Sequence, residues 1–358
     1  MAHEYDREGG GTSPTQRLDA FQRRHPVVGF PIGVIYKFVE DQGPYLAALI
    51  TYYGFLSLFP LLLLLTSVLG FVLDGRPGLQ EQILDSTLSQ FPVIGDQLAD
   101  PQGLQGSVGA IIVGGLVAVY GALGFAQAIQ NAINVSWSVP RNRRPNPIRA
   151  RLRSLRLIAV AGIAVVVTTV LSGAGSNAGA FGAELGRSST LVALGISIVV
   201  NGMVFVVMFR IFRPDGTRTR DTVPGAIVAA VIWQLLQVFG AVFVGSGVQG
   251  SGATYGTFAL VLGLFAWTFL AAVGIVVGSE INVVRVRRLY PRALLTPFTD
   301  NVDLTEADQR AYLEAVNSQQ FKGFQSVTVR YEDDGQQASA RRARNEAGEQ
   351  LDGSPDHP

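Results

Sequence analysis

Uncharged polar side chains recur inside long apolar stretches of this sequence, where each one needs a hydrogen-bond partner. Four amides follow helical spacing in GFAQAIQNAINVSW: Gln127, Gln130, Asn131 and Asn134. On a helix they fall, with Trp137, within an arc of about 120°. Other polar or kink-forming residues lie in the remaining apolar stretches: Tyr53, Ser57, Pro60, Asn201, Gln234, Gln237, Tyr255, Glu280 and Asn282. Because polar groups at membrane depth often line a cavity, these residues are our candidates for a substrate pathway.

The residue types that most enzymes and metal sites require are absent or badly placed. The chain has no cysteine, so it has no disulfide, thiolate nucleophile or thiolate metal site, and its histidines lie near the ends at His3, His25 and His357. No HExxH, metal-spaced His or Asp cluster, or phosphate-binding GxxxxGK(S/T) occurs. The segment GSGVQGSG resembles a nucleotide-binding loop, but it follows a predicted span on the outer side, where ATP is not available. We therefore expect no catalytic residues, no metal and no cofactor.

Long charge-free runs must position these polar residues. The chain is 48% hydrophobic and 15% charged, whereas soluble domains usually carry about 25% charged residues. Residues 42–73, 101–140, 157–183, 188–209 and 222–279 contain no Asp, Glu, Lys or Arg. A crossing helix needs about 20 apolar residues, so each of the first four runs holds one span. The last holds two, divided at residues 245–254. A soluble buried α-bundle is the alternative, but it would need polar helix faces that these runs lack.

The sequence therefore predicts an all-α integral membrane protein with six transmembrane helices. We expect them at about 45–71, 108–135, 156–175, 189–210, 224–244 and 257–280. Residues 1–44 should form a cytoplasmic tail with interfacial helices, which Pro26 and Pro31 break into pieces and in which Ile32, Ile35 and Val39 repeat at helical spacing. Four basic side chains should anchor these helices at the membrane surface: Arg17, Arg23, Arg24 and Lys37. The transmembrane domain covers 45–284. The cytoplasmic tail, 285–358, is expected to be largely disordered after about 332.

Two further helices are expected outside the spans. Residues 75–105 are too polar to cross the membrane and predict a short external amphipathic helix. Residues 304–316 predict a helix in the cytoplasmic tail, with Thr305 and Asp308 in capping-box spacing.

Arginine clusters set the expected orientation. Seven arginines lie between Arg141 and Arg156, and others follow the fourth and sixth spans, whereas each of the alternate loops has at most one arginine. Basic short loops stay in the cytoplasm, so both termini should face that side of the cytoplasmic (inner) membrane. The polar N-terminus predicts no cleavable signal peptide.

The arginine clusters should attract anionic lipid headgroups at about 1 kcal/mol per residue. Nucleic acid is not expected, because no aromatic residue is interleaved in 141–156 to stack a base.

The candidate polar residues allow two interpretations. Interhelical amide bonds, worth about 0.6 kcal/mol each, would make them structural, whereas a stripe of amides favours a polar cavity. Glu280 either pairs with Arg285 or Arg288 or has a role in coupling or substrate contact. It lies about 160° from Asn282 on a straight helix, so the two cannot share a face.

The first span contains its own polar face. Tyr53, Ser57 and Pro60 lie within about 60° of one another on a helical wheel. Pro60 leaves the carbonyl of Leu56 without its helical donor and predicts a kink. Since neighbouring helices, hydroxyls or water must satisfy that group, we expect this face to point into the bundle.

Several blocks of the sequence resemble one family. They are LAALITYYGFLSLFPLLLLLTSVLGF, QAIQNAINVSWSVPR, GAIVAAVIWQLLQ and YGTFALVLGLFAWTFLAAVGIVVGSEIN. In this order they resemble the YihY/BrkB family of inner-membrane proteins, formerly labelled ribonuclease BN, and most of all its YhjD-like envelope proteins. The resemblance implies six helices, a contribution to envelope integrity and transport of lipid or lipid-linked substrates. The ribonuclease label does not fit, because Glu280 is the only acidic residue at the edge of the matched spans.

Three functions follow in order of preference. The first is a transporter or flippase-like protein for a lipid or lipid-linked envelope component, driven by an ion or by a partner because no ATP site is present. The second is a structural or assembly protein that moves no substrate. The third is a membrane-embedded enzyme. Membrane lipids are the expected partners, and a homo-oligomer is compatible with the sequence.

Overall fold

A computed structural model of the chain describes residues 14–72, 108–179, 187–247, 253–298 and 302–331. Every regular element in these residues is a helix, which confirms an all-α protein. The predicted external helix within 75–105 and the tail after 332 lie outside the described residues.

Six long helices coincide with the six predicted spans. They are α3 (Gly43–Val72), α6 (Val108–Ser136), α7 (Pro147–Gly179), α8 (Arg187–Phe212), α9 (Thr219–Gly247) and α10 (Ala253–Arg287). The shortest has 26 residues and the longest 35, so each exceeds the roughly 20 residues that a crossing requires. Among the described side chains, residues 115–136, 219–240 and 261–287 are long and apolar enough to cross a membrane. These stretches confirm membrane-type helices, and the count of six crossings stays a prediction.

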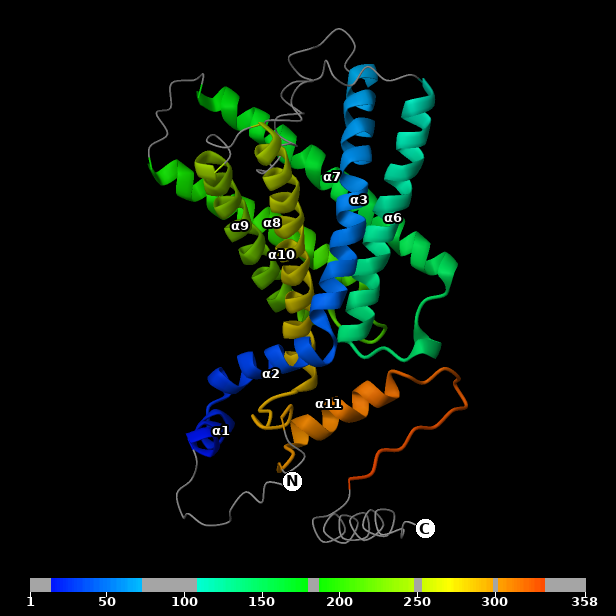
Figure 1. Cartoon of the computed structure of the whole chain (residues 1–358), viewed down its shortest axis with the longest axis vertical. Helices are drawn as coiled ribbons and strands as arrows, with labels where there is room; N and C mark the ends of the chain where they lie inside the picture. The colour runs from blue at the N-terminus through cyan, green and yellow to red at the C-terminus, as the bar shows by residue number, and fades with distance from the viewer. Residues whose placement is uncertain (1–13, 73–107, 180–186, 248–252, 299–301, 332–358) are drawn as a thin grey trace, which may run out of the picture.

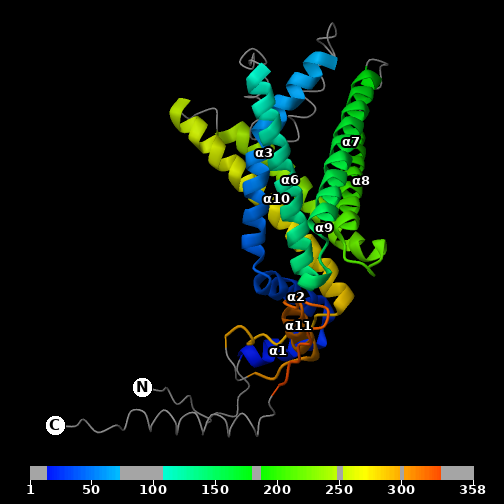
Figure 2. The same cartoon turned by 90° about the vertical axis from the view of Figure 1, so that its right-hand side faces the viewer.

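The long helices contact one another in a closed order. Helix α3 packs on α6 and α10, α9 packs on α10 and α8, and α7 contacts α6 and α8. Figures 1 and 2 show α7 and α8 diverging from the other helices toward the end remote from α2. The six helices therefore do not run parallel over their whole length.

Glycines allow two of these helix pairs to approach closely. A Cβ added to Gly121 of α6 would lie 2.7 Å from the Cβ of Ser57 in α3. A Cβ added to Gly225 of α9 would lie 1.8 Å from the carbonyl oxygen of Gly278 in α10. Small residues at such crossings let backbones touch, which is the usual route to tight association in a bilayer. Both crossings are therefore closely packed.

Three shorter helices lie together at one end of the bundle of long helices (Figure 1). They are α1 (Pro14–Arg24), α2 (Pro26–Glu40) and α11 (Glu306–Asn317). Two expectations for α2 are corrected here. Pro31 lies inside the helix without ending it, because it removes only one hydrogen bond close to the N-terminal end. Lys37, expected at the surface, is buried together with Gly29, Gly33 and Val34 on one face.

Arg292, which follows α10, holds this end together. Its buried guanidinium forms ion pairs with Glu40 of α2 and with Asp308 of α11. Asp308 also accepts hydrogen bonds from the backbone of Ala293 (3.0 Å) and of Thr305 (2.9 Å). The reciprocal bonds of Thr305 and Asp308 form a capping box, which confirms that prediction and the helix that it starts.

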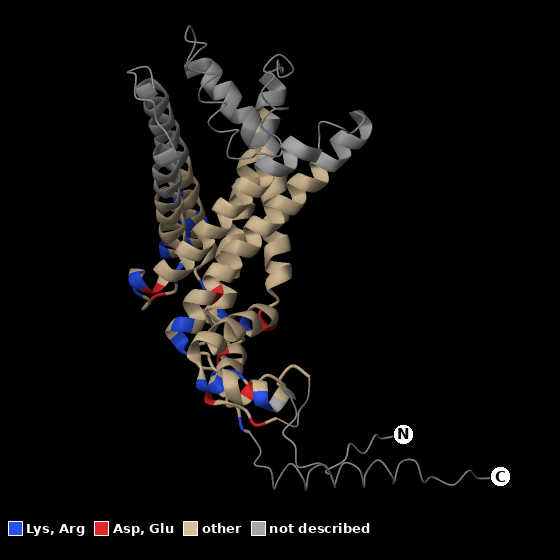
Figure 3. Cartoon of the chain, turned by 90° about the vertical axis from the view of Figure 1, so that its left-hand side faces the viewer, with Lys and Arg blue, Asp and Glu red and all other residues tan. Residues whose placement is uncertain are grey.

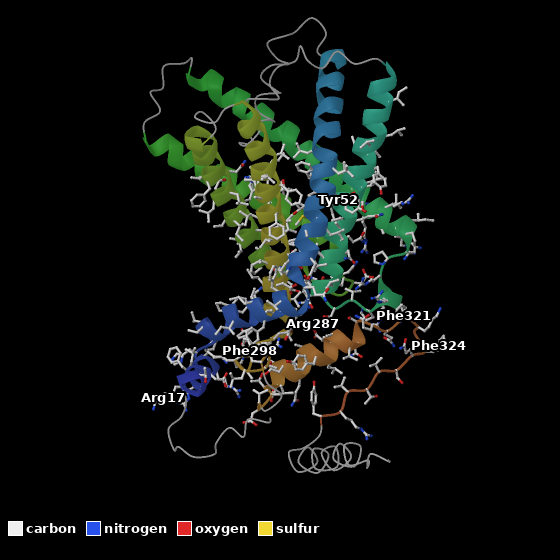
Figure 4. The ribbon with its side chains drawn as sticks, in the orientation of Figure 1. Arg17, Tyr52, Arg287, Phe298, Phe321 and Phe324 are labelled. Atoms are coloured by element: carbon white, nitrogen blue, oxygen red, sulfur yellow. The ribbon has the colours of Figure 1, made fainter. Side chains whose placement is uncertain are left out.

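The segment after α11 returns to the connection between α6 and α7. The backbone N–H groups of Arg141 and Asn142, in the short 3₁₀ helix η2 (Arg141–Arg143) of that connection, donate to the carbonyls of Ser318 and Gln320. The Arg141 guanidinium lies 5.0 Å from the ring centroid of Phe321. Figure 4 shows Phe321 and Phe324 on this segment, beyond the end of α11. Helix α11 and the segment after it therefore connect α2, the residues that follow α10 and the α6–α7 connection.

Candidate functional site

The amide stripe of α6 passes from the surface into the bundle. Gln127 is exposed, Asn131 is half-buried, and Gln130 and Asn134 are buried with 4% and 7% exposure. The Oδ1 atom of Asn131 lies 3.5 Å from Nη1 of Arg144, a weak contact. Nε2 of Gln130 has no hydrogen-bond partner among the described atoms. The structure therefore brings Gln130 and Asn134 to the interior and leaves Gln127 outside it.

The polar face of α3 packs against the same helix. Ser57 is buried beside Gly121, and its Oγ donates to the carbonyl of Gly54 in its own helix at 2.9 Å. Tyr53 is half-buried, and its ring lies against Gly124 and edge-on to Tyr120 at 6.5 Å. Its neighbour Tyr52 is exposed, as Figure 4 shows. Pro60 lies within the continuous helix α3, but its side chain is outside the described set.

The amides of α8 and α9 are only partly buried. Asn201 of α8 and Gln234 and Gln237 of α9 have intermediate exposure. Between the two glutamines, the carbonyl of Leu236 accepts a hydrogen bond from Nε1 of Trp267 at 3.3 Å. This bond ties α9 to α10 and is structural in character. The side chain of Tyr255, at the start of α10, lies outside the described set.

Asn282 and Glu280 point to different neighbours, as their angular separation predicts. Oδ1 of Asn282 accepts from the backbone N–H of Gly225 in α9 at 2.8 Å. Oε1 of Glu280 accepts from Oγ of Ser136, the last residue of α6, at 2.8 Å. Of the two roles considered for Glu280, pairing with an arginine is not found, because its charged neighbours are Lys37 and Asp41 while Arg285 is exposed.

Glu280 is therefore part of a buried polar cluster, which we define as Lys37, Asp41, Ser136 and Glu280. Nζ of Lys37 pairs with Oδ2 of Asp41, one turn further along the chain. Lys37 is 2% exposed and Glu280 is 0% exposed. Oε2 of Glu280 has no partner among the described atoms. The cluster joins α2, the turn before α3, α6 and α10 at the end of the bundle that carries α2 and α11.

Electrostatics in the cluster follow from burial and from opposite charges. Burial lowers the pKa of Lys37, but the nearby carboxyls of Glu280 and Asp41 outweigh it, so the pKa is raised overall. Burial raises the pKa of Asp41, and the favourable charge of Lys37 only partly opposes that rise. Lys37 therefore stays protonated and positively charged, and one of the two carboxyl groups tends to stay protonated as well.

Sequence reasoning found Glu280 but missed its partners. A signal was present: Gly29, Gly33 and Lys37 follow i, i+4, i+8, and Lys37 and Asp41 are again four residues apart, on one face of α2. Glycines on a helix face indicate a close neighbour, and the lysine shares that face. Among the described residues, no group of three or more His, Asp or Glu side chains is arranged for a metal ion.

A comparison with known protein families matches most of the chain. The family model described as "Virulence factor BrkB" matches residues 34–300. This chain belongs to the BrkB family. The match includes all four residues of the buried polar cluster and all six long helices, but neither α1 nor α11. The resemblance expected from the sequence is confirmed.

Relatives of this BrkB-family chain come from several bacteria. The ribonuclease-like protein YfkH of Bacillus subtilis (strain 168) is 26% identical over 263 residues, which cover 70% of this chain and 93% of the relative. The inner membrane protein YhjD of Escherichia coli (strain K12) is 25% identical over 268 residues, covering 70% of this chain and 79% of the relative. The membrane protein Smlt0865 of Stenotrophomonas maltophilia (strain K279a) is 26% identical, but the match covers only 62% of that relative. No solved structure matches this chain significantly.

Proposed function

We propose that this BrkB-family protein is a transporter or flippase-like protein for a lipid or lipid-linked envelope component, through which it contributes to envelope integrity. We place it in the cytoplasmic membrane with six spans and both termini in the cytoplasm. The name of the Escherichia coli relative, an inner membrane protein, supports the location. Figure 3 supports the orientation: among the described residues, the charged side chains gather at the end that carries α1, α2 and α11. Basic segments beside spans remain on the cytoplasmic side.

The observation that carries the proposal is the buried amide of Gln130 beside Asn134 on α6. Both side chains are withdrawn from the surface, yet Nε2 of Gln130 has no partner among the described atoms. An unsatisfied polar group costs several kcal/mol in a bilayer. A purely structural helix would avoid that cost with an apolar residue, whereas a substrate pathway needs a group that is free to bind a headgroup.

The arrangement of the helices supports a lipid rather than a small soluble substrate. Helices α7 and α8 diverge from the rest of the bundle (Figure 2). A lipid enters a protein sideways from the bilayer, so its pathway requires helices that separate laterally. The arginines of the α6–α7 connection would attract an anionic headgroup to this side.

A second candidate, a structural or assembly protein, is favoured by a different observation. The side chains of Asn282 and Trp267 both form hydrogen bonds with backbone atoms of α9. Some of the polar side chains in the bundle therefore bond one helix to another. The ribonuclease-like name belongs to the Bacillus subtilis relative, and we do not propose that activity for this chain. We propose no metal and no cofactor.

Reconstitution into vesicles tests the proposal. Purified protein in vesicles with a fluorescent phospholipid should increase the fraction of label that a membrane-impermeant reductant reaches in the outer leaflet. Gln130→Leu should abolish the increase. Gln127→Leu is the matched control, because it makes the same change one turn away at an exposed position. Equal loss in both variants, or activity retained in Gln130→Leu, would contradict the pathway.

The substrate and the oligomeric state need a separate measurement. Native mass spectrometry from nanodiscs should show an anionic or lipid-linked species that co-purifies with the wild type and is depleted in Gln130→Leu. The same spectra report whether the protein is a homo-oligomer. A protein that retains only bulk lipids, in the same proportions as the variant, would favour the structural candidate.

A further inference from the structure

The buried polar cluster contains one base and two acids. Lys37 supplies one positive charge, and the carboxyls of Asp41 and Glu280 supply two negative charges when both are ionised. Lys37 and Glu280 are almost completely withdrawn from solvent, and the side chain of Asp41 is 11% exposed. An unbalanced charge in such a place costs several kcal/mol. The cluster is neutral only if it also binds one positive charge.

The contacts indicate where that charge lies. The carboxyls of Asp41 and Glu280 lie close enough for each to affect the ionisation of the other. A bond between two carboxyl groups requires a proton on one of them, because ionised carboxylates only accept. Ser136 donates to Oε1 of Glu280, whereas Oε2 has no hydrogen-bond partner among the described atoms. Oε2 is therefore the oxygen that can carry a proton, while Oε1 serves as the acceptor.

We propose that the cluster is a proton-binding site, in which Asp41 and Glu280 share one proton under the positive charge of Lys37. In the bound state, Oε2–H of Glu280 donates to the Asp41 carboxylate, which also pairs with Lys37. Release of the proton to water leaves two carboxylates facing one ammonium across α2 and α10. Repulsion between them then favours separation of α10 from the turn that follows α2.

Other charged groups near the site belong to α2 and to α11. Glu40 adds a negative charge near Lys37 and Asp41, and Glu314 of α11 also acts on both residues. Glu314 lies 3.4 Å from the guanidinium of Arg287, which largely balances it. Figure 4 shows Arg287 where α10 passes between α2 and α11. The shared proton therefore remains the charge that neutralises the interior of the cluster.

If the proposed transport is correct, this site indicates that the ion coupled to transport is the proton. The proton-binding site itself does not depend on the proposed transport. It lies where α10 and α6 meet the interfacial helix α2, so proton release changes a contact between the bundle and its cytoplasmic end. No ATP-binding sequence is needed for transport driven in this way.

Infrared spectroscopy of the whole protein in lipid tests the site without a substrate. The wild type at neutral pH should show the C=O band of a buried protonated carboxyl, which shifts in heavy water and disappears on alkaline titration. Glu280→Gln should lose this band. Glu306→Gln, an exposed glutamate of α11, is the matched control and should keep it.

A second variant protects the test against misfolding of Glu280→Gln. Asp41→Asn leaves Glu280 in place and removes the other acid. The single positive charge of Lys37 is then balanced by one ionised Glu280, so Glu280 should ionise and the band should vanish at neutral pH. Lys37→Met should have the opposite effect and extend the band to higher pH. Size-exclusion profiles report whether each variant is folded.

Two results would overturn the proposal. One is a wild-type spectrum without a protonated carboxyl, or a band that persists in both Glu280→Gln and Asp41→Asn. The other is a band whose titration shifts with sodium but not with choline, which would mean that a metal cation occupies the site. If the wild type shows the carboxyl band but moves no lipid in vesicles, only the proposed transport function is contradicted.

Discussion

Gly225 of α9 faces the carbonyl oxygen of Gly278 in α10 so closely that a Cβ on Gly225 would lie 1.8 Å from it. The same added Cβ would lie 2.6 Å from Nδ2 of Asn282, whose Oδ1 accepts from the Gly225 backbone. These contacts are far shorter than van der Waals distance. The two backbones must therefore separate if either glycine gains a side chain.

We expect Gly225→Ala to destabilise the bundle. Overpacking costs about 1–3 kcal/mol when side chains can yield, and here the obstacle is backbone, so the effect should lie at the upper end of that range. Thermal unfolding in mild detergent measures it. Gly202→Ala on the neighbouring helix α8 is the control, because its nearest contact would be at 3.9 Å. Equal melting temperatures for the two variants would contradict this crossing.

The contact between α3 and α6 allows a double-mutant test. A Cβ on Gly124 would lie 2.2 Å from Cδ1 of Tyr53, so Gly124→Ala should destabilise the protein through the tyrosine ring. Tyr53→Ala removes that ring and should restore part of the stability lost in Gly124→Ala. The two changes should therefore be strongly non-additive in thermal unfolding. Additive effects would mean that Tyr53 does not face Gly124.

Arg292 should be essential for docking of α11. Arg292→Met leaves the fully buried carboxylate of Asp308 without its cation, and breaking a buried ion pair in this way costs about 3–5 kcal/mol. Hydrogen exchange should show α11 losing protection while α3 and α6 keep theirs. Arg285→Met, at an exposed position of α10, is the control and should leave α11 protected. Unchanged exchange in Arg292→Met would contradict the role of Arg292 as the link between α2 and α11.

The sequence was sufficient for the helices but not for the cluster beneath them. Charge-free runs predict each long helix because apolar length alone determines it, and the spacing of Thr305 and Asp308 predicts a cap because that interaction is local. The partners of Glu280 are different. Lys37 and Asp41 reach it only after α2 folds back beneath α10. The spacing of Gly29, Gly33 and Lys37 indicates a closely packed face of α2 but does not say which distant segment covers it. For the same reason Arg292, one arginine in a basic segment, gave no sign that it is buried.

Docking of α11 should also weaken as pH rises from the acidic range. Burial raises the pKa of Glu314 above its ordinary value of 4.5, and Arg287 only partly opposes the rise. A carboxyl whose pKa is higher in the folded state binds its proton more tightly there. Stability is therefore highest below the ordinary value and falls as pH passes from that value through the raised one. The same direction holds for Asp41, whose pKa is also raised.

Glu314→Gln should make this pH dependence shallower without removing it, because Asp41 remains. The measurement is the thermal unfolding midpoint over a series of pH values from mildly acidic to neutral. Glu306→Gln lies on the same helix at an exposed position and should retain the wild-type slope. A midpoint that rises with pH in the wild type would contradict the sign of the effect.

The absence of cysteine makes the proposed orientation directly measurable. Single-cysteine variants can be labelled in intact cells with a membrane-impermeant maleimide, with no background from the chain itself. Asp215→Cys is an exposed position between α8 and α9 and should stay unlabelled until the cells are permeabilised. Gln80→Cys lies in the segment predicted to be external and should be labelled at once. The basic α6–α7 connection, probed by the exposed Arg151→Cys, should behave like Asp215→Cys because basic loops remain inside. Immediate labelling of Asp215→Cys together with protection of Gln80→Cys would invert the orientation, and it would place the buried polar cluster on the outer side.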